Sequence, residues 1–503
     1  MTKKLLTIVM FLLAAGTVAQ AQLNLKNLKD AAKKVTGGNN AATNTAANAV
    51  NKAASATPAA KGKTYYVSAS TGSARADGLS SSTPMKDLQK AITAAEDNDV
   101  ILVAEGNYLG NMDRGYIECG RFGNSSQEAD RGKFISIYGG YSPDFSERDV
   151  IKHVTKLQPT EQKFIAPLFN MNARRPYGYN GPEGNVVIDG LVFDFGENNL
   201  YCAANVNDEI TGTPNEGVLT GRFIEPDGAP NCPKVGYHNG DEYALHLDVE
   251  GNVRISNCIF VNCRDYGIAG LMGKGHIEIS NNIFIACRYA ACQIRGSVRD
   301  ADIPLVSLDF HHNTVLFTWT RTKVFDDMGQ GFRFMNGIRT IEVHNNIFGC
   351  NSNCGVERVY YETTPAMENA KISNLYDNYF FANRRDLEIA AAGVASISVP
   401  AARIEEAEQI GPKYEGNMEM PEGNDAFINA IDQPYLEGFL TLKIMSSQSY
   451  NANSAANQVN RMFGLNQQGT EIVRPSMYCN KYPWEKAKDL FGKVNNYGAQ
   501  MPR

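Results

Sequence analysis

Long apolar runs are nearly absent from this chain of 503 residues. The main apolar stretch, residues 5–15, is shorter than the roughly 18–20 residues that span a bilayer, so we expect no transmembrane segment. Lys3 and Lys4 precede this stretch, and the small residues Ala19 and Ala21 follow it as a cleavage motif. We therefore predict a signal peptide over residues 1–21 and a secreted, periplasmic or cell-surface location.

Basic residues are also not in excess. The chain has 48 Lys and Arg against 54 Asp and Glu, and its formal net charge is −6. Nucleic-acid binders usually carry a basic footprint, so no nucleic-acid partner is expected. The 10 cysteines are too few at this length for a fold built on disulfides.

Large apolar residues are scarce over residues 22–62, where Ala, Asn, Thr and Lys prevail. Such a segment cannot bury enough surface to fold, so we predict a flexible tether there. The remainder divides into a predicted repeat domain over residues 63–445 and a capping tail over residues 446–503. A helix expected near residues 484–491 would cap the open end of the repeat domain.

The repeat domain is predicted from a short recurring pattern. An apolar strand leads to a polar corner, usually Asn, and two apolar residues follow. Seven segments carry it, at 135–140, 187–192, 255–260, 279–284, 310–315, 343–348 and 375–380. The last five corners, at 258, 282, 313, 346 and 378, are 24, 31, 33 and 32 residues apart. Steps of this size predict a solenoid with one coil per repeat.

Stacked coils place like residues about 4.8 Å apart. The corner asparagines are therefore predicted to take unusual backbone angles and to form a hydrogen-bonded ladder of Asn282, Asn313, Asn346 and Asn378. The step from Gly190 to Cys258 is 68 residues, more than two coils' worth. Because its interior is rich in turn residues, we predict an inserted loop over residues 198–243.

The beginning of the repeat domain has a pattern of its own. A strand at 64–68, a helix start at Thr83 and Pro84, a strand at 100–103 and a turn at 105–108 follow one another. This order resembles the N-terminal cap of secreted bacterial pectin-lyase-like proteins. The resemblance implies an all-β fold, a single-stranded right-handed parallel β-helix, with residues 63–110 as a helix-containing N-terminal cap.

Alternation along each strand predicts which side chains point away from the core. Counting from the corners at 258 and 282, we expect inward positions at Leu245, Leu247, Ile268, Gly270, Cys292, Ile294, Phe332 and Phe334. The outward positions on the same strands are His246, Asp248, Ala269, Leu271, Gln293, Arg295 and Arg333. Outward residues of stacked strands form a flat wall, and small Ala269 is expected to leave space between its polar neighbours.

Arginines recur at the corners beside this wall, at Arg264, Arg288, Arg321 and Arg384. The planar guanidinium can bind a carboxylate or sulfate through two hydrogen bonds, so these residues predict a basic stripe. The alternative is that they pair on a solvated face with carboxylates, namely Asp265, Asp300, Asp302 or Asp386.

The family resemblance implies that the wall holds an acidic polysaccharide. Cleavage by β-elimination needs a base and positive charge near the uronate carboxylate. We assign His246 as base and Arg295 and Arg333 as neutralising groups, with Lys274 and His276 in reserve. The expected substrate-binding residues are Asp248, Arg264, Lys274, Arg288, Gln293 and Arg321. A glycoside hydrolase would need a second carboxylate, and Asp248 has none that the sequence assigns.

Metal and thiol chemistry have weaker signals. Asp326 and Asp327 are a candidate Ca²⁺ site, but adjacent carboxylates on a loop are usually only solvated, so no cofactor is assigned. Cys263 and Cys287 share one position on successive coils, which allows either a disulfide or stacked thiols. Cys202 and Cys232 are candidates to clasp the inserted loop. His311, His312 and His344 precede ladder positions and are expected at the corner or surface.

The sequence therefore predicts a monomeric polysaccharide lyase-like enzyme. The lack of the Asp-rich calcium motif and of a Lys/Arg dyad motif keeps a second function open. This is a non-catalytic glycan-binding or adhesin-like surface protein. A structural role in the cell envelope is a third.

Overall fold

The computed structural model describes residues 62–110, 117–121, 132–159, 167–174, 184–196, 201–202, 234–235, 243–263, 265–296, 306–318, 329–360, 372–391, 397–407, 411–440 and 481–502. The predicted signal peptide, nearly all of the tether and most of the inserted loop lie outside these residues. So do Arg264, Arg321, Asp326 and Asp327, and much of the predicted tail.

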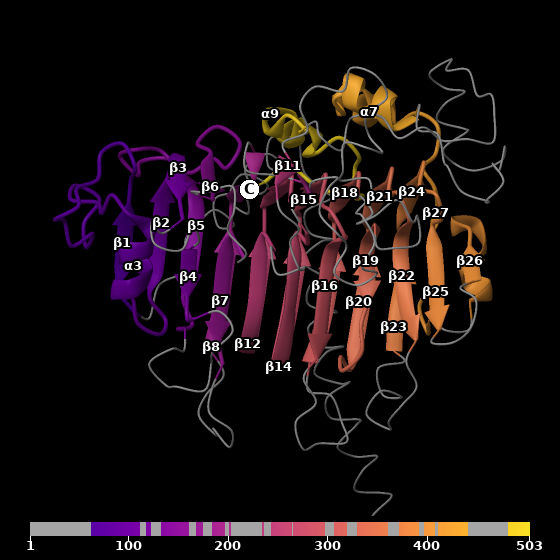
Figure 1. Cartoon of the computed structure of the whole chain (residues 1–503), viewed down its shortest axis with the longest axis horizontal. Helices are drawn as coiled ribbons and strands as arrows, with labels where there is room; N and C mark the ends of the chain where they lie inside the picture. The colour runs from indigo at the N-terminus through magenta and orange to yellow at the C-terminus, as the bar shows by residue number, and fades with distance from the viewer. Residues whose placement is uncertain are drawn as a thin grey trace, which may run out of the picture. The chain divides into compact units, whose positions relative to one another are not determined.

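The described chain forms a right-handed parallel β-helix of three sheets, called here sheets A, B and C (Figure 1). Sheet A contains Thr64–Val67 (β1), Val100–Ala104 (β2), Ser136–Tyr141 (β5), Gly184–Asp189 (β8), the second halves of Leu245–Ser256 (β12) and Ile268–Ser280 (β14), Val306–His311 (β17), Thr340–His344 (β20) and Ile372–Tyr376 (β23).

The other two sheets complete each coil. Sheet B contains Gly106–Leu109 (β3), Thr155–Gln158 (β6), Leu191–Asp194 (β9), Ile259–Val261 (β13), Ile283–Ile285 (β15), Thr314–Leu316 (β18), Ile347–Gly349 (β21), Tyr379–Phe381 (β24) and Met418–Glu419 (β27). Sheet C contains Ile117–Cys119 (β4), Phe169–Ala173 (β7), the first halves of β12 and β14, Ala290–Gly296 (β16), Gln330–Phe334 (β19), Cys354–Tyr360 (β22), Leu387–Ala391 (β25) and the antiparallel Ile397–Val399 (β26).

Strands β8 and β12 are direct neighbours in sheet A, with Ile188 opposite Ile255. The residues between them therefore add no coil to that sheet. Within this segment the structure describes a short parallel pair, Tyr201–Cys202 (β10) and Lys234–Val235 (β11).

The predicted asparagine ladder is confirmed. Each backbone N–H of Asn282, Asn313 and Asn346 donates to the Oδ1 of the next ladder residue at 2.8–3.0 Å. Asn417 extends the ladder beyond Asn378, and all four predicted members are fully buried. Since buried polar groups are costly without partners, the ladder satisfies the polar atoms at one corner of the coils from Asn282 to Asn417.

The unusual backbone angles fall one residue before the ladder, not on it. Asn257, Asn281, His312, Asn345 and Asp377 have φ values between 49° and 59°. This left-handed conformation turns the chain from sheet A into sheet B and leaves the next residue pointing inward. A second set of left-handed residues ends the short strands of sheet B, at Asn262, Ala286, Phe317, Cys350 and Ala382.

The N-terminal cap begins its helix later than the sequence indicates. Met85 is bridged to both Val67 and Ser73, so the residues after Pro84 are held in extended structure. The helix Leu88–Ala94 (α3) starts beyond this bridge, and the Asp87 side chain accepts a hydrogen bond from the Lys90 N–H. Thr83 is therefore not the N-cap, and Asp87 takes that role.

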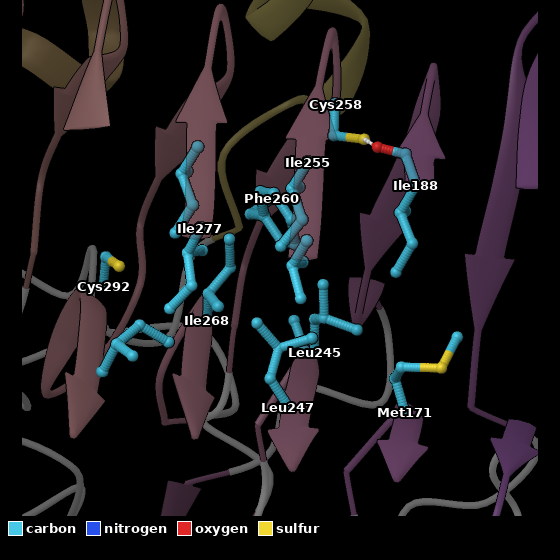
Figure 2. Packing of buried hydrophobic residues seen from close by; sticks show 14 of the residues in the cluster. Met171, Ile188, Leu245, Leu247, Ile255, Cys258, Phe260, Ile268, Ile277 and Cys292 are labelled. Atoms are coloured by element: carbon cyan, nitrogen blue, oxygen red, sulfur yellow. Dashed lines mark hydrogen bonds between the residues drawn. The ribbon is translucent and has the colours of Figure 1, made fainter. Parts of the chain in front are cut away.

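The core consists of stacked inward side chains. Figure 2 shows Met171, Leu247, Ile268 and Cys292 among those lying between the sheets. Phe193, Phe260 and Phe284 stack on successive coils with centroids 4.6 and 4.8 Å apart and planes 6° from parallel. Burial of such side chains is worth about 1.5–3 kcal/mol each and is the main force that holds the coils together.

The predicted end cap is wrong for residues 481–502. Sheet B carries outward apolar side chains, including Ile259 and Ile283, and the C-terminal segment buries them. Its elements are Trp484–Ala487 (α9) and Lys488–Leu490 (η6), close to the helix expected there. The Tyr482 N–H donates to Asn262 Oδ1 at 2.8 Å, and the Ala499 N–H donates to Thr314 Oγ1 at 3.0 Å. The segment therefore runs along the side of the coils (Figure 1).

Other elements complete the C-terminal part. Asp425–Ala430 (α6) and Gln433–Leu440 (α7) join the same apolar cover on sheet B. Strand β26 and Ala401–Glu406 (η4) add Val399, Ala401 and Ile404 to the core beside the last coil. Among the helices that the structure describes, none is long and apolar enough to cross a membrane.

Candidate functional site

The predicted inward and outward positions of sheet C are confirmed. Strand register places His246 beside Ala269, Ala269 beside Gln293, and Gln293 beside Arg333. The inward neighbours are buried, with Leu245, Leu247, Ile268, Cys292, Ile294, Phe332 and Phe334 all at 0% exposure. The fixed step between coils explains why residues up to 87 positions apart in sequence share one line.

This line of outward residues is longer than the sequence indicates. We call it the polar column, and it consists of Glu118, Asn170, His246, Ala269, Gln293, Arg333, Glu357 and Glu388. Its added members also alternate with apolar residues, as in Phe169-Asn170-Met171. That alternation in the sequence could have identified these residues as outward-facing. Because the loops vary in length, the sequence did not show where each residue lies on its coil.

His246 is half-buried and tightly held. Its Nδ1 lies 2.8 Å from Asn170 Oδ1, and its ring stacks on Tyr243 with centroids 5.4 Å apart and planes at 18°. Burial, together with the positive charge of Arg174, lowers the pKa of His246 to about 4. The imidazole is therefore neutral at neutral pH, and its neutral form can accept a proton.

Arg333 is held between two side chains of the polar column. Its Nε donates to Glu357 Oε2, and its Nη1 donates to Gln293 Oε1. The guanidinium thus points back toward Gln293, one strand closer to His246 than its own backbone. Burial opposes the charged form of Arg333, but Glu357, Tyr266 and Cys354 together raise its pKa above the usual value.

A second outward line lies beside the polar column. Asp248 is opposite Leu271, which is opposite Arg295. Arg295 is exposed, whereas Asp248 forms an ion pair with Arg174. The structure therefore puts the three proposed catalytic residues on one face, with His246 and Arg333 in one column and Arg295 in the next.

The space expected above Ala269 is occupied. Tyr243, Tyr266 and Tyr289 pack against Ala269, which is only 4% exposed. The three tyrosines recur every 23 residues, a signal present in the sequence. Any ligand on this part of the wall would therefore meet aromatic rings and not an empty gap.

Two further predictions about cationic residues need correction. Arg288 is 1% exposed, lies 3.9 Å from Asp265 and contacts the Tyr289 ring, so it cannot bind substrate. Arg288 lies beside Asp265 as the alternative predicts, but both side chains are buried and not on a solvated face. His276 lies in sheet A, with Nδ1 2.9 Å from Ser307 Oγ, and is no reserve base for sheet C.

Lys274 lies at the bend of β14, between its halves in sheets C and A. It is half-buried and opposite Glu250, at the margin of the wall. Arg264 and Arg321, the other proposed binding residues, fall outside the described part of the chain.

The sulfur and metal predictions can be tested only in part. Cys263 and Cys287 are buried free thiols on successive coils, so the stacked reduced pair is the correct alternative. Side-chain contacts of Cys202 and Cys232 are outside what the structure describes. Within the described residues, no group of three or more His, Cys, Asp or Glu is arranged to hold a metal ion.

The histidines near the ladder form a separate cluster on sheet A. The rings of His311 and His344 stack with centroids 5.0 Å apart and planes at 5°. His344 Nε2 lies 3.1 Å from Asp309 Oδ1, and its Nδ1 lies 2.7 Å from Asn345 Oδ1. Asn345 Nδ2 donates to the Asn496 carbonyl, which fixes the amide orientation. Both nitrogens of His344 therefore face acceptors, as in a charged imidazolium.

Comparison with known proteins gives distant likenesses among solved structures. No family model and no curated protein matches the chain. Among solved structures, pectate lyase Pel9A is similar at 12% identity and a TM-score of 0.26, over 82% of this chain and 89% of that one. The GH136 lacto-N-biosidase from Eubacterium ramulus is similar at 14% identity and a TM-score of 0.23. That likeness covers 65% of this chain and 52% of the other.

A third solved structure, the complex of XylC with xylose, is similar at 11% identity and a TM-score of 0.16. The likeness covers 66% of this chain and 76% of that one. Likenesses this distant carry no argument about activity, so the function has to be argued from the residues of the wall.

Proposed function

We propose that the protein is an extracytoplasmic polysaccharide lyase-like enzyme that binds an acidic glycan along sheet C and cleaves it by β-elimination. The observation that carries this proposal is the polar column itself. It presents a neutral histidine, an amide and a guanidinium on one rigid face, in a line that suits an extended polymer.

In the proposed reaction His246 Nε2 takes the proton alpha to the uronate carboxylate. The electron pair left behind forms a carbon–carbon double bond, and the bond between the β carbon and the glycosidic oxygen breaks. The proton held on His246 Nε2 then passes to that oxygen, which restores the neutral imidazole. His246 and Gln293 are two strands apart, about 10 Å at the usual strand spacing, and the reacting sugar would lie over the tyrosine rings that cover Ala269 between them. Arg333, drawn toward Gln293, is placed to stabilise the negative charge that develops on the carboxylate.

Arg333 can stabilise a substrate carboxylate only if its existing ion pair allows it. Arg333 already pairs with Glu357, so a substrate carboxylate must share or displace that contact. Arg295 is exposed on the neighbouring line and supplies the more accessible positive charge. We therefore assign initial binding to Arg295 and charge stabilisation during the reaction to Arg333.

A non-catalytic glycan-binding protein is the second candidate, and one observation favours it. Several charged side chains of the wall are already paired, as in Arg333 with Glu357, Arg174 with Asp248 and Arg385 with Glu388. Such pairs stiffen a surface without providing a reactive group. Binding would then depend on Arg295 and leave His246 without a role.

Incubation with a panel of uronic-acid polymers separates the candidates. A lyase releases an unsaturated uronate that absorbs in the ultraviolet, and His246→Ala should lower that rate by about 100-fold or more. His276→Ala, a histidine on sheet A, is the matched control and should leave the rate unchanged. New reducing ends without absorbance would instead indicate hydrolysis, for which Glu357 and Glu388 are neighbouring carboxylates.

Binding without any product would support the second candidate. In that case Arg295→Ala should weaken binding, while His246→Ala should not. No product with any polymer, together with unchanged glycan binding by His246→Ala, would remove the lyase proposal.

A further inference from the structure

We propose that Asn170 is a positioning residue that fixes the proton of His246 on Nδ1 and so presents the Nε2 lone pair as the base. The catalytic part of this role rests on the proposed function. The choice of the protonated nitrogen does not, because it follows from hydrogen bonding alone.

The direction of the Asn170 amide is settled by its other contact. Asn170 Nδ2 lies 2.6 Å from the carbonyl oxygen of Gly120. Only the amide nitrogen can donate to a carbonyl, so the amide oxygen is the atom that faces His246. That oxygen lies 2.8 Å from His246 Nδ1 and can only accept a hydrogen bond.

His246 Nδ1 must therefore carry the proton. A neutral imidazole has one protonated nitrogen and one lone pair, so the lone pair belongs to Nε2. Free histidine exchanges between both arrangements, whereas the amide oxygen of Asn170 favours one of them. Selecting the correct arrangement in advance is the usual task of the group that orients a catalytic histidine.

The surroundings keep this contact in place. Asn170 is fully buried on β7, and strand register puts it directly beside His246. Tyr243 stacks on the imidazole and restricts rotation of the ring. Burial and Arg174 keep the imidazole uncharged at neutral pH. The ring then carries one proton, which can be on either Nδ1 or Nε2.

The test uses nitrogen NMR of the ¹⁵N-labelled full chain, which distinguishes protonated from unprotonated ring nitrogens. His246→Gln assigns the signals by their loss. Asn170→Ala removes the acceptor, and Asn170→Asp keeps an acceptor but adds negative charge. The matched control is Asn172→Ala, since Asn172 is an outward, buried Asn on the same strand that bonds the Arg121 carbonyl.

We expect the wild type and Asn172→Ala to show the proton on Nδ1. Asn170→Ala should show a mixture or the proton on Nε2, and Asn170→Asp should retain Nδ1–H and titrate at higher pH. In the lyase assay Asn170→Ala should lower kcat by about tenfold or more with little change in KM.

Wild-type protein with the proton on Nε2 would overturn the inference, even if the Ala variant failed to fold. So would an Asn170→Ala spectrum that matched the wild type. The two proposals fail separately. If no polymer is cleaved, the lyase proposal falls and the NMR result still decides the role of Asn170.

Discussion

Replacement of Asn313 by alanine tests whether the ladder supports the whole fold. Asn313 lies in the middle of the ladder and is fully buried. Its Oδ1 accepts from the N–H and the Nδ2 of Asn282, at 3.0 and 3.1 Å. Its Nδ2 donates to the Ile279 carbonyl at 2.8 Å and to Asn346 Oδ1 at 3.2 Å. Alanine removes all four contacts, although its own N–H can still donate to Asn346 Oδ1.

Of the four buried atoms that lose a partner, Asn282 Nδ2 keeps its bond to the Ile255 carbonyl and Asn346 Oδ1 keeps its bond to the N–H of residue 313. The loss therefore falls mainly on the Asn282 N–H and the Ile279 carbonyl. Each buried group left unsatisfied costs about 1–3 kcal/mol, so we expect the free energy of unfolding to fall by about 2–6 kcal/mol. That is a large share of the roughly 5–15 kcal/mol by which native domains are stable.

Urea unfolding followed by circular dichroism measures the loss. The matched control is Asn107→Ala, an exposed Asn on β3 whose side chain donates a hydrogen bond to Gln158 Oε1 at 2.7 Å. The control should cost no more than about 0.5 kcal/mol. A loss for Asn313→Ala below about 1 kcal/mol, or equal to that of the control, would refute the claim that ladder hydrogen bonds hold neighbouring coils together.

Further predictions concern pH, the core and the C-terminal segment. Burial opposes the charge on His344, but hydrogen bonds to Asp309 and Asn345 raise its pKa above the usual value. The charged form of His344 therefore stabilises the fold fully below about pH 6.5, and this contribution is lost as pH rises through the folded pKa. In His344→Gln the urea midpoint of unfolding should change less with pH over that range. Phe284→Ala should lower the free energy of unfolding by about 3–5 kcal/mol in the same assay, because the ring is fully buried in the stack. Gly498 has a φ of 65°, and a Cβ there would lie 2.6 Å from both Ile347 and Thr314. Gly498→Val should therefore speed protease cleavage within residues 481–502. Gly423→Val is also strained, at a φ of 91°, but has nothing within 4 Å of a Cβ and should not speed cleavage in that segment.

The column of His246, Gln293 and Arg333 shows which features of the site can be predicted from local sequence. Side chains alternate along a strand, and the corner asparagines mark where each coil begins. Together these rules place a residue on the inner or outer face of a known coil. They predicted the ladder and the outward register without any knowledge of the loops.

The same rules do not reveal what an outward side chain touches. Arg288 and Arg333 are both predicted to meet the substrate, yet one is buried beside Asp265 and the other bridges Gln293 and Glu357. The difference depends on loops of variable length and on which tyrosines fold over Ala269. These contacts form only when the coils are stacked.

The position of the C-terminal segment also required the tertiary structure. The apolar outward face of sheet B needs a cover, but nothing local states which part of the chain provides it. Tyr482 reaches Asn262 across 220 residues of sequence. The sequence by itself determined the coil, its register and its ladder, because those follow from short-range periodicity. Tertiary structure alone decided the partners, since contacts between distant segments depend on the packing of the whole chain.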